Sequence, residues 1–520
     1  MIPSKYSQTR RLFLRRSVAL GAAGMAPLVY RLEAMAAAGA QNVDSRIIVP
    51  KAGQSLNNVP VDYKALVCLF MYGGNDCANF IIPYDTNDYN QYALNRTNLA
   101  ISRLGTTPGD ALVNNRGLIP IGPLASQSGR TLAFHPNVGL KNVTITTTPA
   151  QLRGDGIPWL WDNSKLAIVA NAGPLAVPMT KTEYSNKSKT RPQNLFSHSD
   201  QQTTWMTSAA TGYSATGVAG RIADLVDSMN VPPIGQPKIS TCISIAGVNP
   251  YQVADVAPAY QLNSSGPTDL NFPYFNYTGA GAISTAISTA FNEQITRSRN
   301  NFFETQWGGM MNYSLQTKNA IKAALAAPAN ILPGVSPSFG FRTSGNSLSS
   351  QLLMVAKLIN AGAQLGVARQ IFFVQIGGFD VHGTEFHPQN NTNWNKISEA
   401  VRDFYQKMVD IGADQKVTLF SASDFGRTLD SNGLGSDHGW GAHHFVVGGA
   451  VNGGNMYGTF PTVALGSNDD IGRGSLLPTT STDQFHATLA KWFGLTDSQV
   501  LSVLPNLGAF SPTYLDFLPH

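Results

Sequence analysis

The sequence is poor in cysteine, and its few cysteines form no pattern. Three occur in 520 residues, Cys68, Cys77 and Cys242, and none belongs to a CxxC pair. An odd count without such spacing excludes a disulfide framework and a zinc finger. We therefore expect the three thiols to be buried as small hydrophobic groups.

The chain also lacks a strongly charged body. Its net charge is +5, but residues 1–40 hold six of the 36 basic residues and one of the 31 acidic residues. Removing that segment leaves 30 residues of each sign, so the remainder is formally neutral. No basic face is implied, and we expect no nucleic-acid partner.

Long apolar runs are missing as well, so we expect no membrane span in the mature form. A moderately apolar stretch from Ser17 to Tyr30 follows Arg10 and Arg11, and small-residue cleavage sites come before residue 41. This order is typical of a twin-arginine signal peptide. We predict a signal over 1–40, a linker over 41–62, the twin-arginine translocation machinery as a partner, and a periplasmic or extracellular location.

Short apolar runs alternate with helical patterns along the rest of the chain. Runs typical of strands buried on both faces occur at 65–71, 166–170, 239–245, 370–376 and 417–420. Helical patterns occur at 347–365, 394–408 and 483–493. This alternation predicts an α/β fold with a mostly parallel central sheet flanked by helices. We expect one domain over 63–515, with an irregular and helical insertion around 247–346.

Polar side chains recur where these strands end. Gly-Gly followed by Asp76 ends the first strand, and Gly-Gly followed by Asp380 and His382 ends a later one. Asp437 and His438 lie in the loop after the strand at 417–420. Ligands of open α/β sheets bind at the carboxyl ends of strands, and imidazole and carboxylate suit zinc or manganese. If these ends are neighbours, the side chains can serve two metal ions. Alternatively, Asp76 makes a turn and the histidines are solvated.

Two serines stand before a predicted helix, at Ser197 and Ser199. Either can cap the helix. A hydroxyl there also faces the positive end of the helix dipole, as a nucleophile would require. Held between two metal ions, it would be deprotonated near neutral pH and able to attack phosphorus or sulfur.

The chain resembles the exported bacterial family DUF1501, which is similar to the alkaline phosphatase and sulfatase superfamily. The residues that carry the resemblance are LVCLFMYGGNDCANFIIPYD (66–85), Ser197 through Trp205, GGFDVH (377–382), SASDFGR (421–427), SDHGWGAHH (436–444) and LPTTSTDQFHATLAKWFG (477–494). The resemblance implies an alkaline-phosphatase-like fold and an exported metal-dependent hydrolase of phosphate or sulfate esters.

The resemblance also implies roles for individual residues. Ser197 is similar to the nucleophile, with Ser199 as its alternative. The implied ligands of two divalent ions (zinc, manganese, magnesium or calcium) are Asp76, Asp380, His382, Asp437, His438 and His443, with His444 as the alternative to His443. Arg427 and Arg473 are candidates to hold a phosphate or sulfate oxygen, although each can equally form a structural ion pair.

The chain departs from the superfamily pattern in two respects. Asp380 and His382 are two residues apart, whereas the superfamily more often spaces this pair by four. No cysteine lies in the Cys-x-Pro-x-Arg context that formylglycine sulfatases require, which argues against that class. Because a fold does not establish activity, the alternatives are a non-catalytic exported binding or assembly protein and a structural single-metal protein.

Overall fold

The computed structural model describes residues 59–103, 117–139, 156–268, 282–327, 332, 341–383 and 386–520. The predicted signal peptide and most of the predicted linker lie outside these residues. The domain boundaries at 63–515 stay a prediction. The helices are α3 (Thr86–Arg96), α4 (Ile157–Asp162), α5 (Lys181–Asn186), α6 (His198–Thr207), α7 (Val218–Val226), α8 (Ala282–Thr296), α9 (Phe302–Ala326), α10 (Ser347–Asn360), α11 (Gly362–Leu365), α12 (Phe386–Asp410), α13 (Thr482–Phe493) and α14 (Asp497–Val503).

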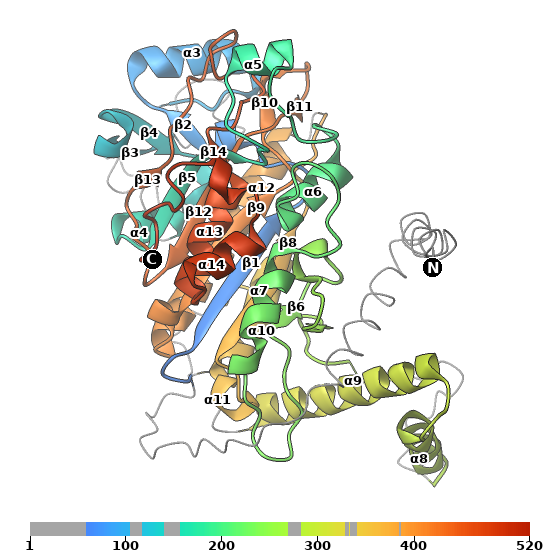
Figure 1. Ribbon diagram of the computed structural model, residues 1–520. Coiled ribbons are helices and arrows are strands. Elements are labelled where there is room, and N and C mark those ends of the chain that lie inside the picture. The colour runs from blue at the N-terminus through green and yellow to red at the C-terminus, as the bar shows by residue number, and fades with distance from the viewer. Residues whose placement is uncertain are drawn as a thin grey trace, which may run out of the picture.

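Within the described residues, nine strands form one twisted sheet (Figure 1). Its members are β1 (Lys64–Met71), β5 (Leu166–Gly173), β6 (Cys242–Ser244), β7 (Ala259–Gln261), β8 (Arg369–Ile376), β9 (Val417–Ser423), β12 (Ala442–Gly448), β13 (Met456–Tyr457) and β14 (Thr480–Ser481). The order is β13-β5-β12-β9-β1-β8-β6-β7, with β14 also paired to β5. The central strand β1 pairs in parallel with both β8 and β9. The predicted α/β fold with a mostly parallel sheet is confirmed.

One strand, β12, runs antiparallel to both of its neighbours, β5 and β9. After β9 the chain forms a small hairpin of β10 (Arg427–Ser431) and β11 (Ser436–His438) and then enters β12 directly. A parallel neighbour would need a crossover, usually a helix, to return the chain to the other end of the sheet, and only the hairpin lies between β9 and β12. The hairpin therefore lies beyond the carboxyl end of β9.

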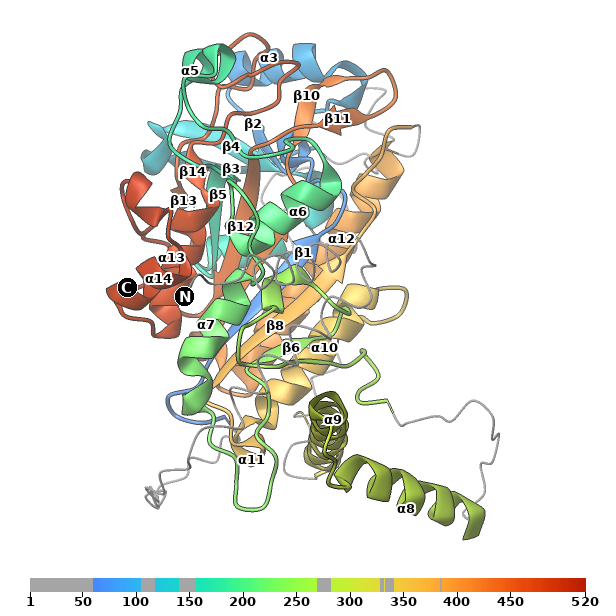
Figure 2. The ribbon, with the colours of Figure 1, turned by 45° about the vertical axis from the view of Figure 1, so that its right-hand side comes forward.

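Both faces of the sheet are covered, which explains the continuous apolar runs. Alternate residues of β1 belong to two separate cores, Val67 and Leu69 to one and Cys68 and Phe70 to the other. Helices α10 and α12 contribute to the first core, and α7, α13 and α14 to the second. Figure 2 shows these helices on opposite sides of the strands. All three cysteines are buried and free, as expected.

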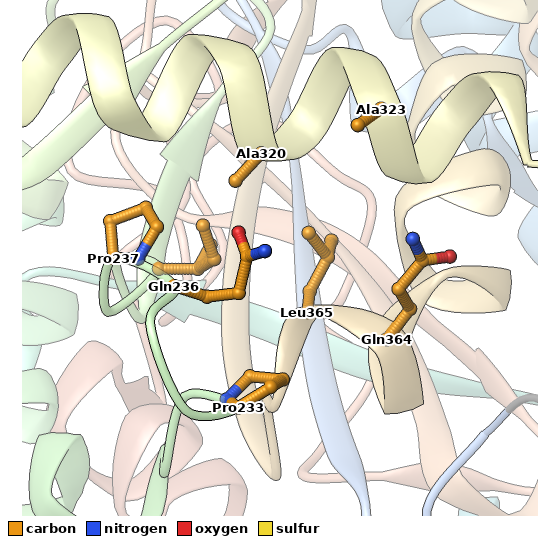
Figure 3. Close-up of a pocket in the computed structure, with 8 residues that line it drawn as sticks. Pro233, Gln236, Pro237, Ala320, Ala323, Gln364 and Leu365 are labelled. Carbon is orange, nitrogen blue, oxygen red and sulfur yellow. The ribbon is translucent and has the colours of Figure 1, made fainter.

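Two parts stand outside this layered body. A three-stranded sheet of β2 (Ile81–Pro83), β4 (Arg130–Phe134) and β3 (Ile119–Leu124) packs into the first core. Helices α8 and α9 project from the body as an arm (Figures 1 and 2). A pocket of about 230 Å³ lies where Ala320 and Ala323 of α9 face Pro233 and Leu365 (Figure 3). No helix among the described residues has the length and apolar character to cross a membrane.

Candidate metal centre

The candidate site lies where three adjacent parallel strands end. The segments that follow β1, β8 and β9 meet there, and an isolated parallel bridge joins Asn75 to Gly426. Gly73 has a φ of +110°, and a Cβ at this position would lie 2.4 Å from the backbone nitrogen of Asp380. Glycine therefore allows the segment after β1 to approach the segment after β8.

Three ligand atoms converge beyond these strand ends. One ligand atom from each of His198, Asp380 and His438 lies within 4.8 Å of the other two. Nε2 of His198 is 3.4 Å from Oδ2 of Asp380, and Nε2 of His438 is 3.7 Å from Oδ1 of the same carboxylate. The three come from the first turn of α6, the segment after β8 and the end of β11. We call them the triad.

The other nitrogen of each triad histidine is engaged outside the triad. Nδ1 of His198 is 2.6 Å from Oδ2 of Asp424, and Nδ1 of His438 is 2.6 Å from the carbonyl oxygen of Phe196. Both partners accept hydrogen bonds, so the protons are assigned to Nδ1 and the lone pairs to Nε2. Metal-binding histidines usually donate their second nitrogen to a carboxylate or carbonyl in this way.

Electrostatics keep the triad in a form that can bind a cation. Burial lowers the pKa of His438, although its bond to Phe196 opposes this, and the neutral imidazole is therefore favoured. Burial raises the pKa of Asp380, but the hydrogen bond and charge of Arg427, with His198 and His382 adding to them, outweigh burial and hold this pKa at about 2. Asp380 is thus ionised at neutral pH.

Asp424 holds the imidazole of His198 in place through a hydrogen bond at Nδ1, the nitrogen that faces away from the triad. It follows β9 directly and its side chain is fully buried. The same Oδ2 that meets His198 accepts hydrogen bonds from Nε2 of Gln202, at 2.9 Å, and from the backbone nitrogen of Gly73, at 3.2 Å. The position of the imidazole is therefore tied both to α6 and to the end of β1.

A strained turn supplies the partner of His438. Phe196 has a φ of 72° and Asn194 a φ of 46°, in the left-handed region that side chains with a Cβ seldom adopt. Phe196 is 36 % exposed, so burial of its ring does not explain the strain. The turn presents its carbonyl to His438 and starts α6 beside the triad, and strain of this kind is concentrated at functional sites.

An apolar wall completes the site. The ring of Phe425 packs 4.8 Å from that of His198 and 4.7 Å from that of His438, measured between ring centroids. The two histidine rings are 4.3 Å apart and nearly perpendicular. This packing limits their rotation and so favours a preorganised site.

Of the predicted site residues, His382 and Asp437 lie next to the triad. Nε2 of His382 is 2.7 Å from Oδ1 of Asp380, and its Nδ1 is 3.5 Å from Oδ1 of Asp437. Asp437 in turn pairs with Arg473, and Asp380 with Arg427 at 2.5 Å. Both arginines predicted to hold substrate are therefore engaged with carboxylates.

Asp76 and His443 make their contacts elsewhere. Asp76 is buried in an ion pair with Arg96 of α3, at 2.5 Å. Nδ1 of His443 accepts a hydrogen bond from the backbone nitrogen of Asn171, and its ring stacks on Phe460. His444, the alternative to His443, lies 3.4 Å from Ser421 and beside Trp205. None of the contacts described for these three residues reaches the triad.

Ser197 occupies the N-cap position of α6, but its side chain does not cap the helix. Its Oγ donates to Oδ2 of Asp200 at 2.6 Å and lies 3.4 Å from Oγ of Ser199. The nucleophile assignment stays a prediction.

His198 and Asp424 are not among the site residues predicted from the sequence. Both carried a signal: Asp424 comes directly after a predicted strand, and His198 directly after Ser197 at a predicted helix start.

The fold and these side chains define an α/β protein with a candidate His–Asp metal centre at the carboxyl edge of its sheet. The family model described as "Protein of unknown function (DUF1501)" matches residues 326–504, the part that contains β8, β9 and the β10–β11 hairpin. A search of curated proteins finds no match. A solved structure from Bacteroides thetaiotaomicron, whose title concerns the metabolism of multiple glycosaminoglycans and includes "sulf", is 10 % identical with a TM-score of 0.25. The alignment covers 84 % of this chain and 74 % of that one, and so low a TM-score does not establish a shared fold.

Proposed function

We propose that the protein is an exported metal-dependent hydrolase of phosphate or sulfate esters, with a divalent ion held by His198, Asp380 and His438. The observation that carries the proposal is the convergence of two Nε2 lone pairs and one ionised carboxylate. Nε2 of His198 is also buried and makes no hydrogen bond to any part of the chain that the structure describes. A bound cation would satisfy it.

The donor set suits a catalytic ion. Two imidazoles and one carboxylate match zinc or manganese better than magnesium or calcium, which prefer oxygen ligands. Three protein ligands leave a coordination position open, as in catalytic zinc sites. Such an ion, when bound, supplies positive charge that polarises an ester oxygen and favours an oxygen nucleophile near neutral pH.

The chain's own residues have distinct roles in this proposal. Asp424 and the carbonyl of Phe196 hold the two imidazoles in the required tautomers. Ser197 is the candidate nucleophile, and Asp200 is placed to accept its proton at 2.6 Å. Attack would form a bond from Oγ to phosphorus or sulfur as the ester oxygen leaves, and water would then release the anion.

The test combines metal analysis of the purified protein with a screen of generic phosphate and sulfate esters. We expect bound zinc or manganese in the wild type, and its loss in His198→Ala and His438→Ala. The matched control is His520→Ala, at the C-terminus, which should keep the metal. A folded wild type that takes up neither ion would refute the proposal and favour the non-catalytic binding or assembly protein.

Ser197→Ala separates the nucleophile from a structural role. If Ser197 attacks the ester, hydrolysis should collapse while metal content and folding persist. Near-normal turnover in this variant would assign the chemistry to Ser199 or to water.

Export by the twin-arginine pathway is part of the proposal and rests on residues outside those the structure describes. Replacing Arg10 and Arg11 by Lys should leave unprocessed precursor in the cytoplasm, detectable by cell fractionation. Normal periplasmic accumulation of that variant would contradict the assignment.

A further inference from the structure

The carboxylates that sequence analysis assigned to two metal ions are each paired with an arginine. Asp76 pairs with Arg96, Asp380 with Arg427, and Asp437 with Arg473. A guanidinium group keeps its proton at any pH that a folded protein experiences. Three of the negative charges that would attract metal ions are therefore compensated within the chain itself.

Arg427 is the arginine in contact with the triad. Its side chain is fully buried, and its Nη2 donates to Oδ1 of Asp380 and to the carbonyl oxygen of Gly73. Nη1 donates to the carbonyl oxygen of Ser436 at 2.9 Å, and Nε to that of Gly74 at 3.4 Å. These bonds come from three separate segments, so the guanidinium is fixed in place and not free to take up a substrate.

The same guanidinium faces the second histidine of the predicted two-ion site. Nη1 of Arg427 lies 3.4 Å from Nε2 of His382. The same Nε2 atom is 2.7 Å from Oδ1 of Asp380. Asp380 and His382, two of the ligands that the resemblance implies, thus both meet Arg427. Oδ2 of Asp380, which Arg427 does not contact, faces Nε2 of His198 at 3.4 Å, whereas Nε2 of His438 lies 3.7 Å from Oδ1.

We propose that the site holds one metal ion, at the triad, and that the Arg427 guanidinium is a fixed substitute for a second cation. The inference rests on the proposed function only in placing an ion at the triad. A divalent ion at Asp380 Oδ1 and His382 would lie against the buried guanidinium of Arg427, and two positive charges at this distance repel each other. The positive charge at this position therefore cannot be removed by a chelator.

The first test is the number of ions that the wild type binds, measured by equilibrium dialysis against Zn²⁺ and Mn²⁺ followed by elemental analysis. We expect one ion per chain. With Mn²⁺, electron paramagnetic resonance should show the six-line spectrum of an isolated ion. Two ions per chain, or a spectrum of a coupled Mn²⁺ pair, would overturn the inference. If the folded protein binds no ion, the proposed function is overturned together with this inference, whereas two bound ions would overturn this inference alone.

The second test removes the charge. Arg427→Met keeps much of the length of the side chain but removes its charge and so frees Asp380 and His382, and we expect the folded variant to bind a second ion. Arg427→Lys keeps a positive charge and should still bind one. A folded Arg427→Met protein that binds only one ion would refute the substitution role. If that variant does not fold, the wild-type stoichiometry and spectrum still decide the question.

Discussion

Removing the charge of Asp424 should weaken metal binding at the triad without unfolding the protein. Asp424→Asn preserves the shape of the side chain and an oxygen that His198, Gln202 and the backbone of Gly73 can still meet. The variant loses the negative charge beside Nδ1 of His198. That charge stabilises the imidazole when Nε2 binds a cation. The variant therefore isolates the electrostatic contribution of this carboxylate.

The size of the effect follows from the geometry. The His198–Asp424 bond is short, at 2.6 Å, and the carboxylate is fully buried, so solvent screens it little. A hydrogen bond to a charged group contributes about 1.5–3 kcal/mol. Loss of such an outer partner typically lowers metal affinity about 10–100-fold, which corresponds to roughly 1.4–2.7 kcal/mol.

The assay is competition for Zn²⁺ against a chromophoric chelator at fixed pH, with circular dichroism to confirm folding. Asp430→Asn is the matched control, because Asp430 is partly exposed and pairs with Arg473 at the rim of the site. It should change the affinity less than about twofold. A folded Asp424→Asn protein with wild-type affinity would refute the role given to this carboxylate, and an equal loss in both variants would indicate a general charge effect.

Three further predictions concern stability and geometry. Arg96→Met leaves Asp76 buried without its partner and should cost about 3–5 kcal/mol in the free energy of unfolding, measured with denaturant, whereas a loss below about 1 kcal/mol would mean that the pair is unimportant. Gly73→Ala should lower zinc affinity, because its Cβ meets the backbone of Asp380, whereas Gly212→Ala, in the same left-handed region but in open space, should not; equal affinities would contradict the close approach. Burial lowers the pKa of four histidines from 6.5 to about 3. Between these two values the unfolded chain binds more protons than the folded protein, so the free energy of unfolding should decrease as pH falls. The decrease is up to about 1.4 kcal/mol per pH unit for each histidine. A flat profile from pH 6.5 to 4 in denaturant titrations would contradict this. The four are His135, His443, His444 and His486.

One buried acid opposes the histidines. Burial raises the pKa of Asp483 from 3.8 to about 7. The folded state therefore binds its proton more tightly, and this stabilisation is lost as pH rises from about 4 to 7. One opposing group offsets one histidine, and the net stability still falls toward acid.

The sheet could be predicted because its strands are buried on both faces and so form uninterrupted apolar runs. The run at 65–71 became β1 and the run at 370–376 became β8, nearly residue for residue. The antiparallel direction of β12 could have been inferred because the segment between β9 and β12 shows no helical pattern that would serve as a crossover. The run at 239–245 was shortened to β6, over Cys242–Ser244, because the apolar pattern does not show where pairing with a neighbour stops.

The site was harder to predict because its residues are defined by their partners. Asp76 follows a strand as Asp380 does, and no local pattern shows that Arg96 of α3 neutralises it. Asp424 and His198 are 226 residues apart and pair through tertiary structure alone. Asp437 was the easier residue to predict because a histidine follows it in the chain, whereas the histidine that Asp424 contacts belongs to another element.

The position of β1 in the sheet also constrains how the chain is made. Lys64 pairs with Arg369 and Ala65 with Val417, so the nearer of its two partner strands is synthesised 305 residues later. At roughly 5–20 residues per second, β1 leaves the ribosome about 15–60 s before either partner exists. Seven of its eight residues are buried in the folded protein, and during this interval they have no sheet to join. Pairing over such sequence separations is slow, and a nascent chain cut short before residue 369 would present this apolar strand to chaperones or to other unfinished chains.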